Sequence, residues 1–152
     1  MRAVLAVVAV VLLSACAGGD AAAPEERPQQ FALRVTTLLR MGDFAAAWAE
    51  LHPAHQELVT RETLRSCWTM TDDVLADPAV DVEVVRVADE DWEIPGTDRT
   101  EPSKAITVRA LGEGGGVLET WTQHAFAVDD EPDRWGWILA PALLADARGD
   151  VC

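Results

Sequence analysis

Residues 38–48 read Leu38-Leu39-Arg40-Met41-Gly42-Asp43-Phe44-Ala45-Ala46-Ala47-Trp48, and this stretch decides how the first half of the chain folds. A glycine ends a helix readily, and an aspartate caps the first turn of the next one. Gly42 and Asp43 therefore predict two consecutive helices within residues 31–51, the second of which Pro53 ends. A third helix is predicted from its N-cap Thr60 to about residue 70, so three helices precede any strand.

The hydrophobic period changes after the helices. Val80, Val82 and Val84 alternate with acidic residues, which predicts a half-buried strand that runs to about residue 88. Further strands are predicted over residues 104–111, 117–128 and 134–139, and a last short helix over residues 141–148. Helices followed by a four-stranded antiparallel meander predict an α+β fold in which one sheet face packs on the helices.

This layout resembles the nuclear transport factor 2-like superfamily over roughly residues 31–148. The resemblance rests on the helix-Gly-Asp-helix stretch 38–48, on Leu51-His52-Pro53 and on Trp135-Gly136-Trp137-Ile138-Leu139. It implies a curved sheet that wraps the N-terminal helix into a cone with a central pocket. The layout is also similar to that of small actinobacterial lipoproteins of unassigned function.

The N-terminus predicts an address outside the cytoplasm. Met1-Arg2 is followed by an apolar run over residues 3–13 that is too short for a membrane span, which needs about 20 residues. Leu13-Ser14-Ala15-Cys16 resembles the lipobox of bacterial lipoproteins, which implies cleavage before Cys16 and lipidation of that residue. The alternative is an ordinary signal peptide in which Cys16 is incidental.

Three segments follow from this assignment: a signal peptide over residues 1–15, the lipidated cysteine and a flexible tether over residues 16–30, and a single domain over residues 31–152. The chain carries 26 Asp+Glu against 12 Lys+Arg, a net charge of −14. Such a surface repels phosphates and anionic lipids, which excludes a nucleic-acid partner and leaves the lipid to hold the protein on the extracytoplasmic face of the membrane.

The cysteines other than Cys16 form an even pair. Cys67 and Cys152 are predicted to form a disulfide, because the predicted compartment permits one. A nucleophilic or metal-binding Cys67 is the alternative, although no His or second Cys stands at a zinc-site or Cys-x-x-Cys spacing.

Six tryptophans and no tyrosine make up an unusual aromatic set. Trp92 falls in an acidic stretch that is expected to be an exposed loop. If a small molecule binds in the cone, the candidate pocket is lined by Trp48, Trp121, His124, Trp135 and Trp137.

Catalysis has little support in the sequence. Isomerases of the superfamily use an Asp base with a Tyr, and this chain has no tyrosine. Cyclase and dehydratase relatives use a His–Asp pair, for which His124 with Asp72 or Asp73 is the available combination. The alternative is that a neighbouring residue on the sheet satisfies His124.

No metal or cofactor site is predicted. His52 and His55 are three residues apart beside Pro53, which indicates surface histidines rather than metal ligands. The acidic runs 89–91 and 129–133 lack the pattern of a calcium loop and are expected to be solvated turns.

Two functions remain open. The first is a membrane-tethered, non-catalytic module that binds another envelope protein, and the second is a carrier or sensor of a small apolar ligand in the cone. A homodimer also stays open, since relatives in the superfamily dimerise. The sequence favours the interaction module.

Overall fold

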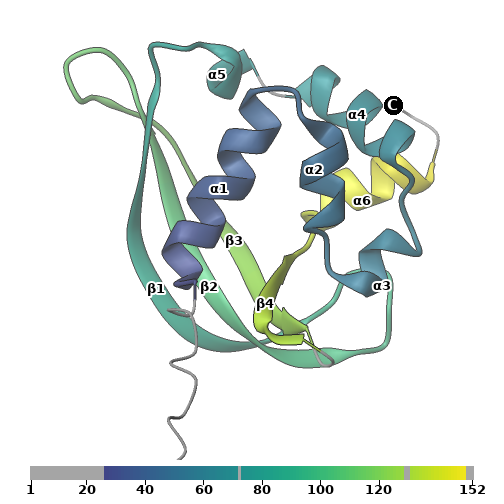
Figure 1. The fold of residues 1–152 in the computed structure, drawn as a ribbon. Coiled ribbons are helices and arrows are strands. Elements are labelled where there is room, and N and C mark those ends of the chain that lie inside the picture. Colours follow the sequence, from purple (N-terminus) through teal and green to yellow (C-terminus); the bar gives the residue numbers. More distant parts are fainter. Residues whose placement is uncertain (1–25, 72, 129–130, 150–152) are drawn as a thin grey trace, which may run out of the picture.

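The computed structural model describes residues 26–71, 73–128 and 131–149. Helices come first, an antiparallel meander follows, and a short helix ends the domain, which confirms the α+β prediction (Figure 1). The elements are α1 (Pro28–Arg40), α2 (Phe44–Ala49), α3 (Pro53–Gln56), α4 (Arg61–Thr71), α5 (Asp73–Ala76), β1 (Asp81–Glu93), β2 (Thr100–Leu111), β3 (Val117–Val128), β4 (Glu131–Trp137) and α6 (Pro141–Arg148).

The junction between α1 and α2 forms as predicted. Gly42 has a φ of +72°, a conformation that other residues adopt at a cost, and the Asp43 carboxylate accepts a hydrogen bond from the Ala46 amide at 3.1 Å. The Thr60 hydroxyl accepts a hydrogen bond from the Thr63 amide at 3.1 Å and caps α4 in the same way.

Pro53 has a different role from the one predicted. Helix α2 already ends at Ala49, and Pro53 is the first residue of α3, a single turn that the sequence analysis missed. Proline suits this position because the first amide of a helix has no partner within the helix. The short helix α5 was missed as well.

The sheet is a four-stranded antiparallel meander in the order β1-β2-β3-β4. Residues 50–52 run beside β4, where the Trp137 amide donates to the Glu50 carbonyl at 3.1 Å and the His52 amide donates to the Trp137 carbonyl at 2.8 Å. Residues 50–52 therefore cover the edge of β4 that does not pair with β3. Strand β1 forms the open edge of the sheet.

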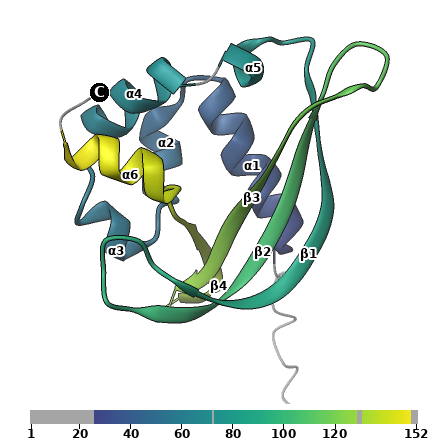
Figure 2. The ribbon, with the colours of Figure 1, turned by 180° about the vertical axis from the view of Figure 1, so that it is seen from behind.

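The sheet is not curled, and the cone implied by the family resemblance is not confirmed. Helix α1 lies across one face of the open meander, which we call the inner face (Figures 1 and 2). It buries Phe31, Ala32, Val35 and Leu39 in the main core. The helices therefore cover the sheet as a layer, and their side chains fill the space between helix and strands.

A second, smaller apolar cluster consists of Ala54, Ile94, Phe126 and Ile138, with Trp92 packed against it. Side chains along a strand alternate between the two faces. Phe126 therefore points away from its neighbour Ala125, which belongs to the main core. This second cluster marks the outer face of the sheet.

Glu26 is fixed to the rest of the domain just before α1. Its carbonyl accepts a hydrogen bond from the Trp135 indole nitrogen at 2.7 Å, and its carboxylate lies 2.9 Å from the Arg34 guanidinium. Hydrogen bonds from Arg34 to Glu26 and to Glu50 raise the pKa of Arg34. No helix in residues 26–71, 73–128 and 131–149 is long and apolar enough to cross a membrane.

Candidate functional site

The five residues of the predicted pocket divide between the two faces of the sheet. Trp121 pairs with Val108 of the main core, so its side chain lies on the inner face. His124 pairs with Ala105 and is three residues further along β3, so its side chain lies on the opposite face. Trp135 and Trp137 pack with Trp121 and Trp48 around the main core. The structure thus brings the four tryptophans to the inner face and places His124 on the outer face.

Three of these indole groups hold the helices to one another and to the sheet. The indole nitrogens of Trp137 and Trp48 donate to the carbonyls of Ala47 and Val59 at 2.8 and 2.7 Å. The indole nitrogen of Trp135 donates to Glu26, as described above. A buried indole N–H needs such a partner, so these donors are already engaged within the fold.

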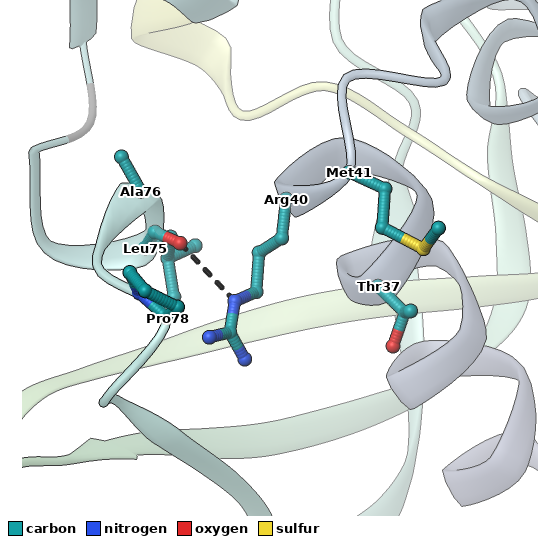
Figure 3. Close-up of a pocket in the computed structure, with 6 residues that line it drawn as sticks. All are labelled: Thr37, Arg40, Met41, Leu75, Ala76 and Pro78. Atoms are coloured by element: carbon teal, nitrogen blue, oxygen red, sulfur yellow. Dashed lines mark hydrogen bonds between the residues drawn. The ribbon is translucent and has the colours of Figure 1, made fainter.

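Four of the surface hollows formed by the described residues stand out, and none of these four is lined by a residue of the predicted pocket. The hollow in Figure 3 has a volume of about 240 Å³ and lies between the C-terminal end of α1 and α5. Its lining residues are Thr37, Arg40, Met41, Leu75, Ala76 and Pro78.

Arg40 has a structural role in this hollow. Its guanidinium donates to the carbonyls of Leu75, Asp77 and Val80 at 3.1, 3.2 and 2.8 Å. Carbonyls at the end of a helix such as α5 lack partners within the helix, so the guanidinium satisfies them and joins α1 to the segment that leads into β1.

His124 lies in an aromatic stack on the outer face. The centre of its ring is 4.1 Å from that of Trp92 at an interplanar angle of 18°, and the Phe126 ring centre is 6.4 Å away. Trp92 belongs to β1, which extends to Glu93, so the prediction of an exposed loop around this residue is wrong. The side chain of Trp92 is half-buried.

Hydrogen bonds determine which nitrogen of the His124 ring carries the proton. The Ser103 hydroxyl donates its one proton to the Glu90 carbonyl at 2.8 Å, so the Nδ1–H of His124 donates to the Ser103 oxygen at 3.2 Å. Burial lowers the pKa of His124, which favours the neutral ring. Of its proposed catalytic partners, Asp72 lies outside the described residues and Asp73 begins α5, with nothing described of its side chain.

His52 and His55 are buried, with 3% and 0% of their surface exposed, so the prediction of surface histidines is wrong. The Nδ1 of His55 accepts from the Leu139 amide at 3.0 Å, and its Nε2–H donates to the Pro95 carbonyl at 3.0 Å. This ring therefore connects α3 to the β1–β2 hairpin and to the segment that follows β4. Burial lowers the pKa of His55 to about 4.

Neither the cysteine nor the acidic residues form a metal site in the described ranges, where no group of three or more His, Cys, Asp or Glu side chains is placed to hold an ion. Cys67 is buried and disulfide-bonded. Its predicted partner Cys152 and the lipidation candidate Cys16 lie outside the described residues, so the Cys67–Cys152 pairing and the lipidation stay predictions.

The acidic residues 89–91 lie in β1 rather than in a turn, which corrects the prediction for this run. In the other acidic run, residues 131–133 begin β4 instead of lying in a turn, which corrects the prediction there, and residues 129 and 130 lie outside the described part. Strand β1 thus carries an exposed acidic edge that the sequence analysis did not identify as a site.

Apolar side chains are exposed at one end of the molecule. Met41 is 78% exposed, and Val117 and Leu118 are 56% and 54% exposed. Met41 follows the C-terminal end of α1, and the other two begin β3 at the β2–β3 hairpin. Both places lie at the end of the domain opposite to the start of α1 (Figure 1). Comparison of the chain with protein-family models, with curated proteins and with solved structures finds no significant match.

Proposed function

We propose that this protein is a lipid-anchored extracytoplasmic lipoprotein whose folded domain is a non-catalytic module that binds another envelope protein. The observation that carries the proposal is the contrast between the inside and the surface of the domain. Three tryptophans of the predicted pocket donate to backbone carbonyls, whereas apolar side chains stand exposed on the surface. Exposed apolar groups such as these are available for contact with a partner protein.

The fixed position of Glu26 orients the domain in this proposal. Helix α1 begins at Pro28, so residues 28–30 of the predicted tether belong to the folded domain. The shortened tether then joins the domain at the start of α1, which lies nearest to the membrane. Helix α1 has 13 residues and spans about 20 Å, so its far end and the β2–β3 hairpin face away from the bilayer. The exposed side chains of Met41, Val117 and Leu118 are then available to a partner.

The domain supports a binding module better than a ligand carrier. A carrier of an apolar ligand needs an enclosed cavity, and none of the four hollows described above is lined by a tryptophan of the predicted pocket. Trp92 lines one of these surface hollows, together with Glu93, Pro95 and Pro141. We keep membership of the nuclear transport factor 2-like superfamily as a proposal that the order of helices and strands supports. An uncurled sheet would make this chain an open variant of that fold.

Native mass spectrometry of the full chain, extracted from its own envelope in a mild detergent, tests this proposal. We expect the intact mass to include acyl chains, and the Cys16→Ser variant to lack them and to leave the membrane fraction. We also expect the native spectrum to show a complex with one protein at fixed stoichiometry. A small-molecule adduct that the inner-face variant Trp121→Ala loses would instead establish a carrier.

A further inference from the structure

We propose that the free edge of β1 binds a cationic, extended segment of a partner protein by strand addition. This inference rests on the proposed binding function and adds a second contact surface to the exposed apolar end of the domain, with the chemistry of the partner that it would bind. It starts from the open edge of the sheet, because an edge strand presents backbone donors and acceptors that can pair with another strand.

The edge of β1 is long and uncovered. The strand has 13 residues and extends over about 40 Å. One side of it pairs with β2, and none of the other described helices and strands lies along its second side in either view (Figures 1 and 2). The opposite side of the sheet differs, because residues 50–52 cover β4.

The exposed side chains of this strand are strongly acidic. They include six carboxylates, those of Asp81, Glu83, Asp89, Glu90, Asp91 and Glu93. Asp89 forms an ion pair with Lys104, and Glu83 lies 3.9 Å from Arg109. The other four carboxylates have no ion-pair partner among residues 26–71, 73–128 and 131–149. Most of the negative charge on this edge is therefore left for a partner to neutralise.

This charge selects the occupant of the edge. A second copy of the chain would place carboxylates opposite carboxylates, which destabilises strand pairing. The bulge between Val84 and Arg86 adds a local twist, a common protection against pairing between identical edges. A strand rich in lysine and arginine would instead be attracted to this edge, because each of its cations could form an ion pair with a carboxylate of β1.

Trp92 adds an aromatic surface at the most acidic part of the edge. It lies between Asp91 and Glu93 in the sequence, so its side chain projects from the outer face together with Glu90, opposite to those two carboxylates, and stacks on His124 there. A half-buried indole offers its free surface to a lysine or arginine, and aromatic rings attract such cations. The residues from Asp89 to Glu93 thus combine backbone pairing groups, carboxylates and an aromatic ring.

Isothermal titration calorimetry of the full chain in neutral detergent micelles tests the inference. The probe is a nine-residue peptide of alternating lysine and valine, compared with a peptide in which glutamate replaces lysine. A third peptide carries N-methyl groups on alternate residues, which keeps its charge but blocks strand pairing. We expect the lysine peptide to bind with a salt-dependent affinity and the other two peptides to fail to bind.

Matched variants locate the site. The edge variant Asp91→Asn/Glu93→Gln and the control variant Glu57→Gln/Glu113→Gln each remove two exposed carboxylates. We expect the edge variant to bind the lysine peptide roughly five- to tenfold more weakly and the control to match the unchanged chain. Equal losses in both variants, or equal binding of the N-methylated peptide, would overturn the inference.

The same titration separates this inference from the proposed function. If the lysine peptide does not bind while native mass spectrometry still shows a protein complex, the interface lies elsewhere and the inference is wrong. Pairing of two copies through β1 would also overturn it, and would appear as a dimer mass that the edge variant strengthens. A small-molecule carrier would instead refute the proposed function whatever the peptide does.

Discussion

The backbone of His52 passes so close to Gly136 that a β-carbon on Gly136 would lie 2.9 Å from the His52 α-carbon and 3.2 Å from its amide nitrogen. Both atoms belong to backbone that pairs with β4, so the contact has little room to relax. We expect Gly136→Ala to lower the free energy of unfolding by about 1–3 kcal/mol. Urea denaturation followed by tryptophan fluorescence measures this change.

Gly116 provides the matched control for that variant. An added β-carbon at Gly116 meets no atom within 4 Å, and its φ is not in the left-handed region. Gly116→Ala should therefore change the free energy of unfolding by less than about 0.5 kcal/mol. A Gly136→Ala variant as stable as this control would show that residues 50–52 do not pass so close to β4.

The buried ring of His55 predicts a loss of stability in acid. Its pKa is about 4 in the folded protein and about 6.5 in an unfolded chain, so between these values the unfolded state binds more protons. Stability is therefore complete above about pH 6.5 and falls as the pH decreases toward 4. The loss from this ring has an upper limit on the order of 3 kcal/mol.

The variant His55→Gln separates this ring from the acidic residues that titrate in the same range. Glutamine can accept from the Leu139 amide and donate to the Pro95 carbonyl but carries no titratable group. Denaturation midpoints between pH 7 and 4 should fall more steeply for the unchanged chain than for His55→Gln. Parallel curves would contradict the assignment of this ring as a buried neutral group.

Gln123 offers a site for stabilisation. It pairs across the sheet with Ile106 of the main core, and its buried amide nitrogen has no hydrogen-bond partner among the described residues. An unsatisfied buried donor costs stability, so Gln123→Leu should raise the free energy of unfolding by about 1 kcal/mol. The exposed neighbour Thr122 serves as control, since Thr122→Leu removes no buried polar group. A destabilised Gln123→Leu would show that the amide is satisfied.

Trp135 should control how firmly the start of the domain is held. Trp135→Phe keeps an aromatic ring but loses the hydrogen bond to the Glu26 carbonyl, and we expect faster amide hydrogen exchange in the first turn of α1. Exchange in α6, at a distance from this contact, should stay unchanged. Equal exchange in both helices of the variant and the unchanged chain would leave Trp135 without this role.

Local signals made much of the fold predictable. The predicted strand 117–128 and helix 141–148 have the observed boundaries, because a glycine-rich turn precedes the strand and a proline starts the helix. Strand β1 was predicted too short because its second half is acidic on both faces. Apolar and polar residues do not alternate there, because most of the side chains are exposed. The sequence pattern therefore did not indicate a strand.

The burial of His55 and the hydrogen-bond partners of the tryptophans depend on contacts between residues far apart in the sequence. These contacts could not be predicted from local sequence patterns. His55 is buried because Pro95 and Leu139, both far along the chain, come together around its ring. The spacing of Trp135 and Trp137 correctly placed them on one face, yet the destinations of their indole donors depend on packing. No local pattern distinguishes a tryptophan that lines a pocket from one that holds a helix.

The central claim is that the domain acts by binding a protein at its surface, and photo-crosslinking in the intact envelope tests it most directly. A photoreactive phenylalanine analogue replaces Glu93 on the β1 edge or, as the control, the exposed Glu57, which follows α3 and is not part of the sheet. The account predicts one discrete protein adduct from position 93, joined through a segment rich in lysine and arginine, and none from position 57. No protein adduct from position 93, together with a small molecule retained by the native protein, would contradict it.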